Sequence, residues 1–98
     1  MTTLGMLSDR DAKVLAEPLL ERGFAQYGFR QVHVAAERDF DGASILRMTA
    51  EVKEQVPARS IIDTLDAIRQ ALMESGDERF VFLSTSTNEN DVVEEDET

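Results

Sequence analysis

Two stretches of alternating apolar and polar residues, joined by a short turn, constrain the fold of this chain most strongly. Within residues 30–38 and 44–53 alternate positions are apolar, and these side chains would share one face: Val32, Val34, Ala36, Leu46, Met48, Ala50 and Val52. Strict alternation of this kind predicts half-buried strands. The Asp41-Gly42 pair between them supplies the positive φ angles of a tight turn. The sequence therefore predicts a β-hairpin over residues 29–53 with one apolar face.

The residues before the hairpin predict a helix. Ser8 precedes acids at positions 9 and 11, a pattern typical of an N-cap followed by charges that complement the helix dipole. An apolar stripe at helical spacing follows: Ala12, Ala16, Leu19, Leu20, Gly23, Phe24 and Tyr27. Pro18 predicts either a kink or a second helix that begins there, because it has no backbone donor. We expect Gly23 to let the helix approach the sheet and Gly28 to adopt a left-handed conformation.

A second amphipathic helix is predicted after the hairpin. Ser60, with Asp63 three residues later, forms a variant of the capping box that opens a helix. The apolar stripe behind it has the spacing i, i+4, i+7 and i+11: Ile61, Leu65, Ile68 and Leu72. Gly76 predicts the end of this helix.

Residues 79–85 predict a third strand, apolar on both of its faces. Because strand–helix–strand connections cross over right-handedly, this strand should run parallel to the second one. We expect it to lie beside the first strand, which gives the strand order 2-1-3. The predicted fold class is α+β: a two-layer sandwich in the order α-β-β-α-β, with a small, mainly antiparallel three-stranded sheet and two helices on one face.

The formal charge of −10, from 20 acidic and 10 basic residues, is concentrated at one end of the chain. Residues 87–98 hold six acids and no base: Glu89, Asp91, Glu94, Glu95, Asp96 and Glu97. We expect residues 1–86 to form a single α+β domain, with residues 1–7 flexible, and residues 87–98 to form a disordered acidic tail. The tail is either a solubilising terminus or an acidic arm for a basic partner. Direct binding of nucleic acid is not expected, because phosphate contacts need clustered Lys and Arg.

The composition predicts a cytoplasmic protein. The chain has no cysteine, no basic segment ahead of an apolar run near its start, and no run approaching the roughly 18 apolar residues of a membrane span. We therefore expect neither a signal peptide nor a membrane partner.

None of the candidate metal-binding or catalytic motifs in the sequence is complete. Glu37, Asp39, Asp41 and Gly42 match positions 1, 3, 5 and 6 of a calcium-binding loop, but Met48 stands at the twelfth, where a bidentate acid is required. His33 is the single histidine, so a zinc site is not expected and a catalytic triad is excluded. We predict no catalytic residue, no metal and no cofactor, and therefore no enzyme.

The second face of the predicted sheet needs cover, because the third strand is apolar on both sides. Either Phe80 and Phe82 or Val81 and Leu83 lie on this face. We expect it to bind another protein or a second copy; the alternative is cover by the first helix or by residues 4–7. Phe40, in the turn, either folds back onto the helices, the favoured arrangement, or protrudes as an anchor. The candidate protein-binding residues are Phe29, His33, Phe40, Ile45, Arg47, Thr49, Phe80 and Phe82.

Three functions fit these features. The preferred one is a small acidic protein-binding module that forms a homodimer and neutralises or escorts a more basic partner, as an antitoxin, immunity protein or inhibitor does. The second is a mimic of nucleic acid that inhibits a DNA- or RNA-binding enzyme, as phage anti-defence proteins do. The third is a secretion-type chaperone, a class of small, acidic, dimeric α/β proteins.

Overall fold

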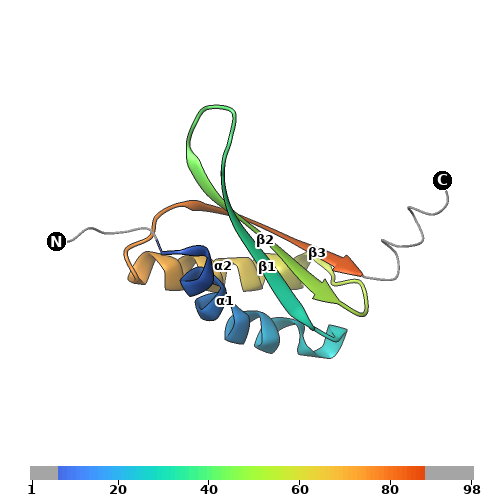
Figure 1. The fold of residues 1–98 in the computed structure, drawn as a ribbon. Helices are drawn as coiled ribbons and strands as arrows, with labels where there is room; N and C mark the ends of the chain where they lie inside the picture. Colours follow the sequence, from blue (N-terminus) through green and yellow to red (C-terminus); the bar gives the residue numbers. More distant parts are fainter. Residues whose placement is uncertain (1–6, 88–98) are drawn as a thin grey trace, which may run out of the picture.

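The computed structural model describes residues 7–87, which form two helices, a short 3₁₀ turn and three strands (Figure 1). In chain order the elements are α1 (Asp9–Phe24), η1 (Ala25–Tyr27), β1 (Gln31–Arg38), β2 (Ser44–Val52), α2 (Ala58–Glu74) and β3 (Phe80–Thr87). Both helices lie on the same side of the sheet (Figure 1). The chain therefore has the predicted α+β class, a two-layer sandwich in the order α-β-β-α-β.

The sheet is mixed, and β2 is its central strand. β1 pairs with β2 in antiparallel orientation, with Val32 opposite Ala50, and β3 pairs with β2 in parallel orientation, with Leu46 opposite Val81. The predicted parallel direction is confirmed, but the predicted order 2-1-3 is wrong, because the order is β1-β2-β3. The physical reason is that β2 carries an apolar residue on its second face as well: Ile45, on the face away from the helices, is only 3% exposed. A strand with this requirement is best placed at the centre of the sheet.

The core lies between the sheet and the helices. Its buried apolar side chains come from all the main elements: Ala12, Ala16, Leu20, Phe24, Val32, Leu46, Met48, Ala50, Val52, Val56, Ile68, Leu72 and Val81. The hydrophobic face predicted for β2 is confirmed in full, since Leu46, Met48, Ala50 and Val52 are all buried. Each large side chain of this kind contributes about 1.5–3 kcal/mol on burial.

Helix α1 begins as predicted and continues past its proline. The Ser8 side-chain oxygen accepts a hydrogen bond from the backbone N–H of Asp11 at 3.0 Å, which confirms the N-cap. The helix runs unbroken through Pro18, so the predicted alternative of a second helix starting there is wrong. Pro18 is exposed, and so is Val14, whose carbonyl loses its helical donor. Water can hydrate that carbonyl, which makes the proline tolerable.

Two glycines sit where a side chain would not fit. A Cβ on Gly23 would clash with the Thr64 side chain, so this glycine allows α1 to approach α2. The prediction that it lets the helix approach the sheet is wrong. The contact is between helices because residue 64 faces α1 and is 5% exposed. Gly28 has a φ of 77°, the left-handed conformation predicted for it.

Helix α2 starts three residues before the position that a capping box at Ser60 predicts. Its first residue is Ala58, its N-cap is Pro57, and no side chain caps it, so the predicted capping box at Ser60 does not form. Pro57, with a φ of −63°, stands just before the first helical residue, and Ala58 and Arg59 are exposed, so water can satisfy the backbone N–H groups that no side chain caps. Gly76, with a φ of 91°, follows the helix end as predicted.

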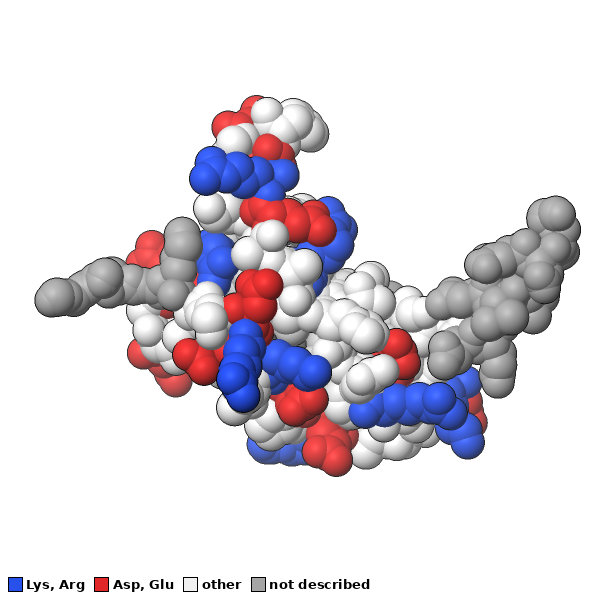
Figure 2. Space-filling view, in the orientation of Figure 1, with Lys and Arg blue, Asp and Glu red and all other residues white. Residues whose placement is uncertain are grey.

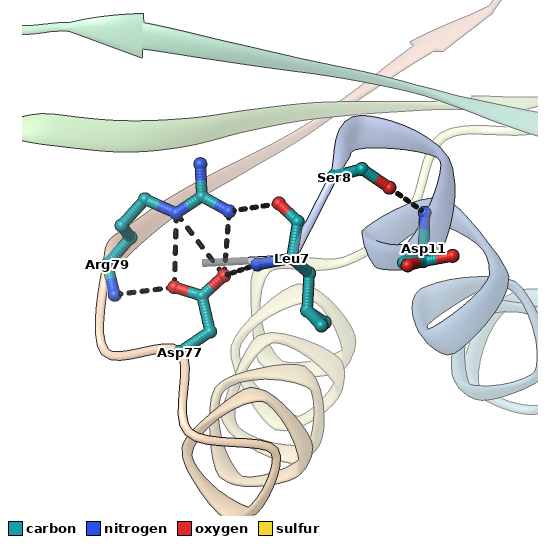
Figure 3. Close-up of polar contacts among 5 residues, drawn as sticks. All are labelled: Leu7, Ser8, Asp11, Asp77 and Arg79. Atoms are coloured by element: carbon teal, nitrogen blue, oxygen red, sulfur yellow. Dashed lines mark hydrogen bonds and ion pairs between the residues drawn. The ribbon is translucent and has the colours of Figure 1, made fainter. Parts of the chain in front are cut away.

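A buried ion pair joins the start of α1 to the connection between α2 and β3 (Figure 3). Arg79 Nη2 donates to Asp77 Oδ2 at 2.7 Å and to the carbonyl of Leu7 at 2.8 Å. The backbone N–H of Leu7 donates to Asp77 Oδ2 at 3.0 Å. Burial would raise the pKa of Asp77, but the hydrogen bonds from Arg79 and from backbone N–H groups, with the charge of Arg79, lower it overall. These hydrogen bonds hold Leu7, just before α1, against the segment that connects α2 to β3.

The β1–β2 hairpin extends beyond the helix layer and stands clear of the body (Figures 1 and 2). Its strands are joined by residues 39–43, a connection longer than a two-residue turn. Gly42 has a φ of 87°, and none of the described non-glycine residues has a positive φ. The positive φ predicted for Asp41 is therefore wrong, because the longer connection needs this conformation only at the glycine.

Candidate protein-binding face

The sheet face opposite the helices is the candidate site, and we call it the open face. Alternate residues of the three strands form it, as their pairing shows: Gln31, His33, Ala35, Glu37, Ile45, Arg47, Thr49, Glu51, Phe80, Phe82, Ser84 and Ser86. On β3 the choice left open by the sequence is resolved, because Val81 is buried in the core and Phe80 and Phe82 face away from it. The alternative in which α1 covers this face is wrong, since α1 packs on the opposite side of the sheet.

An aromatic cluster occupies the end of the open face nearest the hairpin turn. Phe80 and Phe82 are 52% and 43% exposed, and their rings meet edge to face with centroids 4.9 Å apart. Ile45, which pairs with Phe80 across β2 and β3, is 3% exposed although no helix lies over it. The cluster therefore has a buried aliphatic floor and two aromatic rings open to solvent.

Two guanidinium groups flank these rings. The Arg47 guanidinium lies over the Phe82 ring at 5.5 Å from the centroid, and its Nε donates to Glu37 Oε1 at 3.0 Å. Arg69 reaches from α2 to the Phe80 ring, 5.8 Å from its centroid. Cation–π contacts of this kind hold a long side chain in place. The aromatic cluster, defined as Glu37, Ile45, Arg47, Phe80 and Phe82, is thus preorganised rather than a loose set of exposed groups.

A shallow groove extends this cluster around the edge of the sheet. Its walls are Arg69, Met73, Glu78, Arg79 and Phe80, and its volume is about 320 Å³. Met73 is 61% exposed, so an apolar side chain lies on each side of the groove. The groove can take one side chain of a partner that covers Phe80.

The other end of the open face is polar. His33 Nε2 lies 2.6 Å from Glu51 Oε2, and Gln31 Nε2 donates to the second oxygen of the same carboxylate at 3.2 Å. The hydrogen bonds from His33 and then Gln31 lower the pKa of Glu51 below its usual range. Thr49 lies between His33 and Ser84 in the strand pairing. The open face therefore changes from apolar to polar along the strands.

Six of the eight residues predicted for the site lie on this face. Four of them, Ile45, Arg47, Phe80 and Phe82, come together in the aromatic cluster, while His33 and Thr49 lie farther along the strands. Phe29 precedes β1 and is partly buried against the core, so the structure does not bring it to the aromatic cluster.

The predicted position of the Phe40 side chain is wrong. It was expected to fold back onto the helices, but it is 98% exposed. The hairpin turn that holds it projects past the helix layer (Figure 1). The acidic arm formed by Glu89, Asp91, Glu94, Glu95, Asp96 and Glu97 lies outside the described residues.

Sequence reasoning missed Glu37, Glu51 and Arg69. The two glutamates could have been found, since alternation puts them on the same side of their strands as His33 and Arg47. Arg69 could not, because it comes from a helix on the other layer and reaches Phe80 around the sheet edge.

Residues 7–87 hold neither a cluster of metal-binding side chains nor a membrane-spanning helix. No three or more His, Asp or Glu side chains of this part of the chain gather so as to hold a metal ion. None of the helices described here is long and apolar enough to cross a membrane. On the surface seen in Figure 2, acidic and basic side chains are interspersed.

The comparisons with known proteins give no family. No protein-family profile and no curated protein matches the sequence. Among solved structures, a copper form of a variant of the MamM C-terminal domain is 17% identical, with a TM-score of 0.40 over 76% of this chain and 94% of that one. Another variant of that domain is 15% identical, with a TM-score of 0.41 over 80% of this chain and 96% of the other. Similarity at this level indicates nothing about function.

Proposed function

We propose that this chain is a small acidic, non-enzymatic protein-binding module of the cytoplasm that neutralises or escorts a more basic partner protein. The observation that carries the proposal is the aromatic cluster, in which two half-exposed phenylalanines stand on a helix-free sheet face beside a fixed arginine. Aromatic residues and Arg are the residue types enriched in the energetically dominant centres of protein interfaces.

The aromatic cluster supplies the centre of such an interface, not its whole area. Two half-exposed phenylalanine side chains offer about 200 Å² together, whereas a standard interface takes about 800 Å² from each partner. The remaining area is available at the groove beside Met73 and at the polar end around His33 and Glu51. An apolar centre with a polar rim is the usual anatomy of a protein interface.

The net charge favours a basic partner over a second copy. The full chain carries −10, so two copies repel each other while a basic protein is attracted over a distance. The homodimer predicted from the sequence stays a prediction, and it would compete for the same open face. Mimicry of nucleic acid gains no support from Figure 2, where the acids of the visible surface alternate with bases.

The test is to isolate the partner and then to probe the open face by substitution. Proteins that co-elute with the full chain from its native host are identified by mass spectrometry, and the purified partner is titrated against Phe80→Ala and Phe82→Ala. Each change should weaken binding about tenfold or more, as truncation of an interface centre does. Ile62→Ala is the matched control, because Ile62 is 55% exposed on α2, and it should change the affinity less than twofold.

Two results would overturn this assignment of the face. One is equal binding by the wild type and both phenylalanine variants. The other is a dimer, seen in sedimentation velocity up to about 200 μM, that Phe82→Asp converts to a monomer, because a second copy would then occupy the open face. The concentration range is chosen to detect weak association, for which Kd values are micromolar and above.

A further inference from the structure

The hairpin turn presents a phenylalanine that the fold itself does not use. Phe40 is 98% exposed, and the other exposed large apolar residues of the described part of the chain are at most 61% exposed. Turns of this kind normally hold small or polar residues. An apolar ring left in water gains nothing from burial, so folding gives no reason for it.

The turn that holds Phe40 is fixed by Asp39. Its Oδ1 accepts hydrogen bonds from the backbone N–H groups of Asp41 and Ala43, both at 2.9 Å. Its backbone carbonyl accepts from Gly42 N–H at 2.9 Å, and its own N–H donates to the carbonyl of Ala43 at 3.0 Å. Asp in the first position and Gly in the fourth are favoured in the commonest β-turn. A backbone held in this way lowers the entropic cost of binding through the residue it carries.

The charges next to Phe40 restrict what it can enter. Asp39 and Asp41 stand on either side of it, and the nearby Arg38 donates Nη1 to the carbonyl of Gly42 at 3.3 Å. Two carboxylates beside the ring are repelled by anionic lipid head groups and by nucleic-acid phosphates. They are attracted by Lys and Arg side chains of a protein.

We propose that Phe40 is an anchor that inserts into an apolar pocket of a protein partner, and that Lys or Arg side chains form the rim of this pocket. The hairpin whose turn holds Phe40 projects from the body (Figures 1 and 2), so this turn can enter a concave surface of a partner. This contact adds to the proposed function and does not depend on the aromatic cluster. The row of Glu37, Ile45 and Phe80 lies about 10 Å back along the hairpin, at about 3.3 Å per residue, so one partner can meet both.

The experiment places a photo-crosslinking analogue of phenylalanine at position 40 of the full chain, and in separate variants at positions 82 and 62. After irradiation in an extract of the native host, crosslinked peptides are mapped by mass spectrometry. We expect position 40 to label a partner peptide in which apolar residues adjoin Lys or Arg, and position 62 to label none. With that partner purified, Phe40→Ala should lower the affinity about tenfold, and Phe40→Leu should retain most of it. Thermal unfolding should not change, because Phe40 supports no other part of the fold.

Several outcomes would overturn the anchor. These are no adduct at position 40, an adduct with a second copy of this chain, and affinity of Phe40→Ala within twofold of the wild type. An adduct at position 82 without one at position 40 would support the proposed function and reject the anchor. A lipid target is tested with Phe40→Trp, the single tryptophan of that variant. Its emission should not shift with vesicles of phosphatidylcholine and phosphatidylserine, and a blue shift would also reject the proposal.

Discussion

Arg79 Nη2 lies 2.7 Å from Asp77 Oδ2 in a pair whose side chains are 8% and 0% exposed. The same two side chains hold both backbone groups of Leu7 (Figure 3). Each buried charge is compensated by the other, so neither can be removed alone without leaving an unpaired ion in the interior.

Asp77→Ala should therefore lower the free energy of unfolding by about 3–5 kcal/mol, the usual cost of leaving a buried partner unpaired. The measurement is urea unfolding at pH 7, followed by circular dichroism. The matched control is Glu37→Ala, which breaks the Glu37–Arg47 pair, where the side chains are 41% and 51% exposed. An exposed pair contributes about 1 kcal/mol or less. Equal losses in the two variants would contradict the structural role of Asp77.

The same pair predicts how stability depends on pH. The pKa of Asp77 is lower in the folded chain than in the unfolded one, where it is about 3.9. The folded state therefore gains stability from ionised Asp77 above that value and loses it as the pH falls through the folded-state pKa. Unfolding of the wild type and of Asp77→Asn should differ most near neutral pH, and the difference should shrink below about pH 4. A difference that stays constant down to pH 3 would show that the charge of Asp77 is not responsible.

The contact between Gly23 and Thr64 predicts that a substitution favourable to helices is harmful here. Alanine has a higher helix propensity than glycine by about 1 kcal/mol, but its Cβ would clash with the Thr64 side chain. Gly23→Ala should therefore destabilise the fold, by about 1–3 kcal/mol, as overpacking does. Thermal or urea unfolding measures the effect. The double variant with Thr64→Ala should recover much of the loss, and a stabilised single variant would show that the helices are not in close contact.

The acidic residues at the end of the chain predict a kinetic effect on partner binding. Deletion of residues 88–98 removes six acids and changes the net charge from −10 to −4. If the partner is basic, the truncated chain should associate more slowly, and its association rate should depend less on salt. Stopped-flow measurements between about 50 and 300 mM salt span the range in which the Debye length falls below 10 Å. Rates that do not respond to salt in either chain would remove the electrostatic part of the proposal.

The alternation in the hairpin could be interpreted correctly because it depends only on neighbouring residues. The faces of Val32, Leu46 and Met48 follow from the period of a strand, and the N-cap at Ser8 follows from its local pattern of acids. The position of β3 did not follow in this way. Right-handed crossover fixes its direction, but it allows a place beside either hairpin strand.

The residue that indicates the position of β3 beside β2 is Ile45. Ile45 is a large apolar side chain on the polar face of its strand, and a strand with that property gains most from neighbours on both sides. The exposure of Phe40 was beyond the sequence for a different reason. It depends on how far the hairpin extends past the helices, which is decided by the packing of α1 and α2 against the sheet.

The parallel pairing of β3 with β2 also has a consequence for the order in which this molecule is made. The hairpin can form from residues close together in the chain, but Phe80 and Phe82 reach Arg47 only after α2 has crossed over. Contacts between residues distant in sequence form late, because closing the intervening loop is costly. We expect a nascent chain that ends at Gly76 to expose Ile45 and to have no aromatic cluster. The surface proposed to recognise a partner would then be present only after β3 has paired with β2.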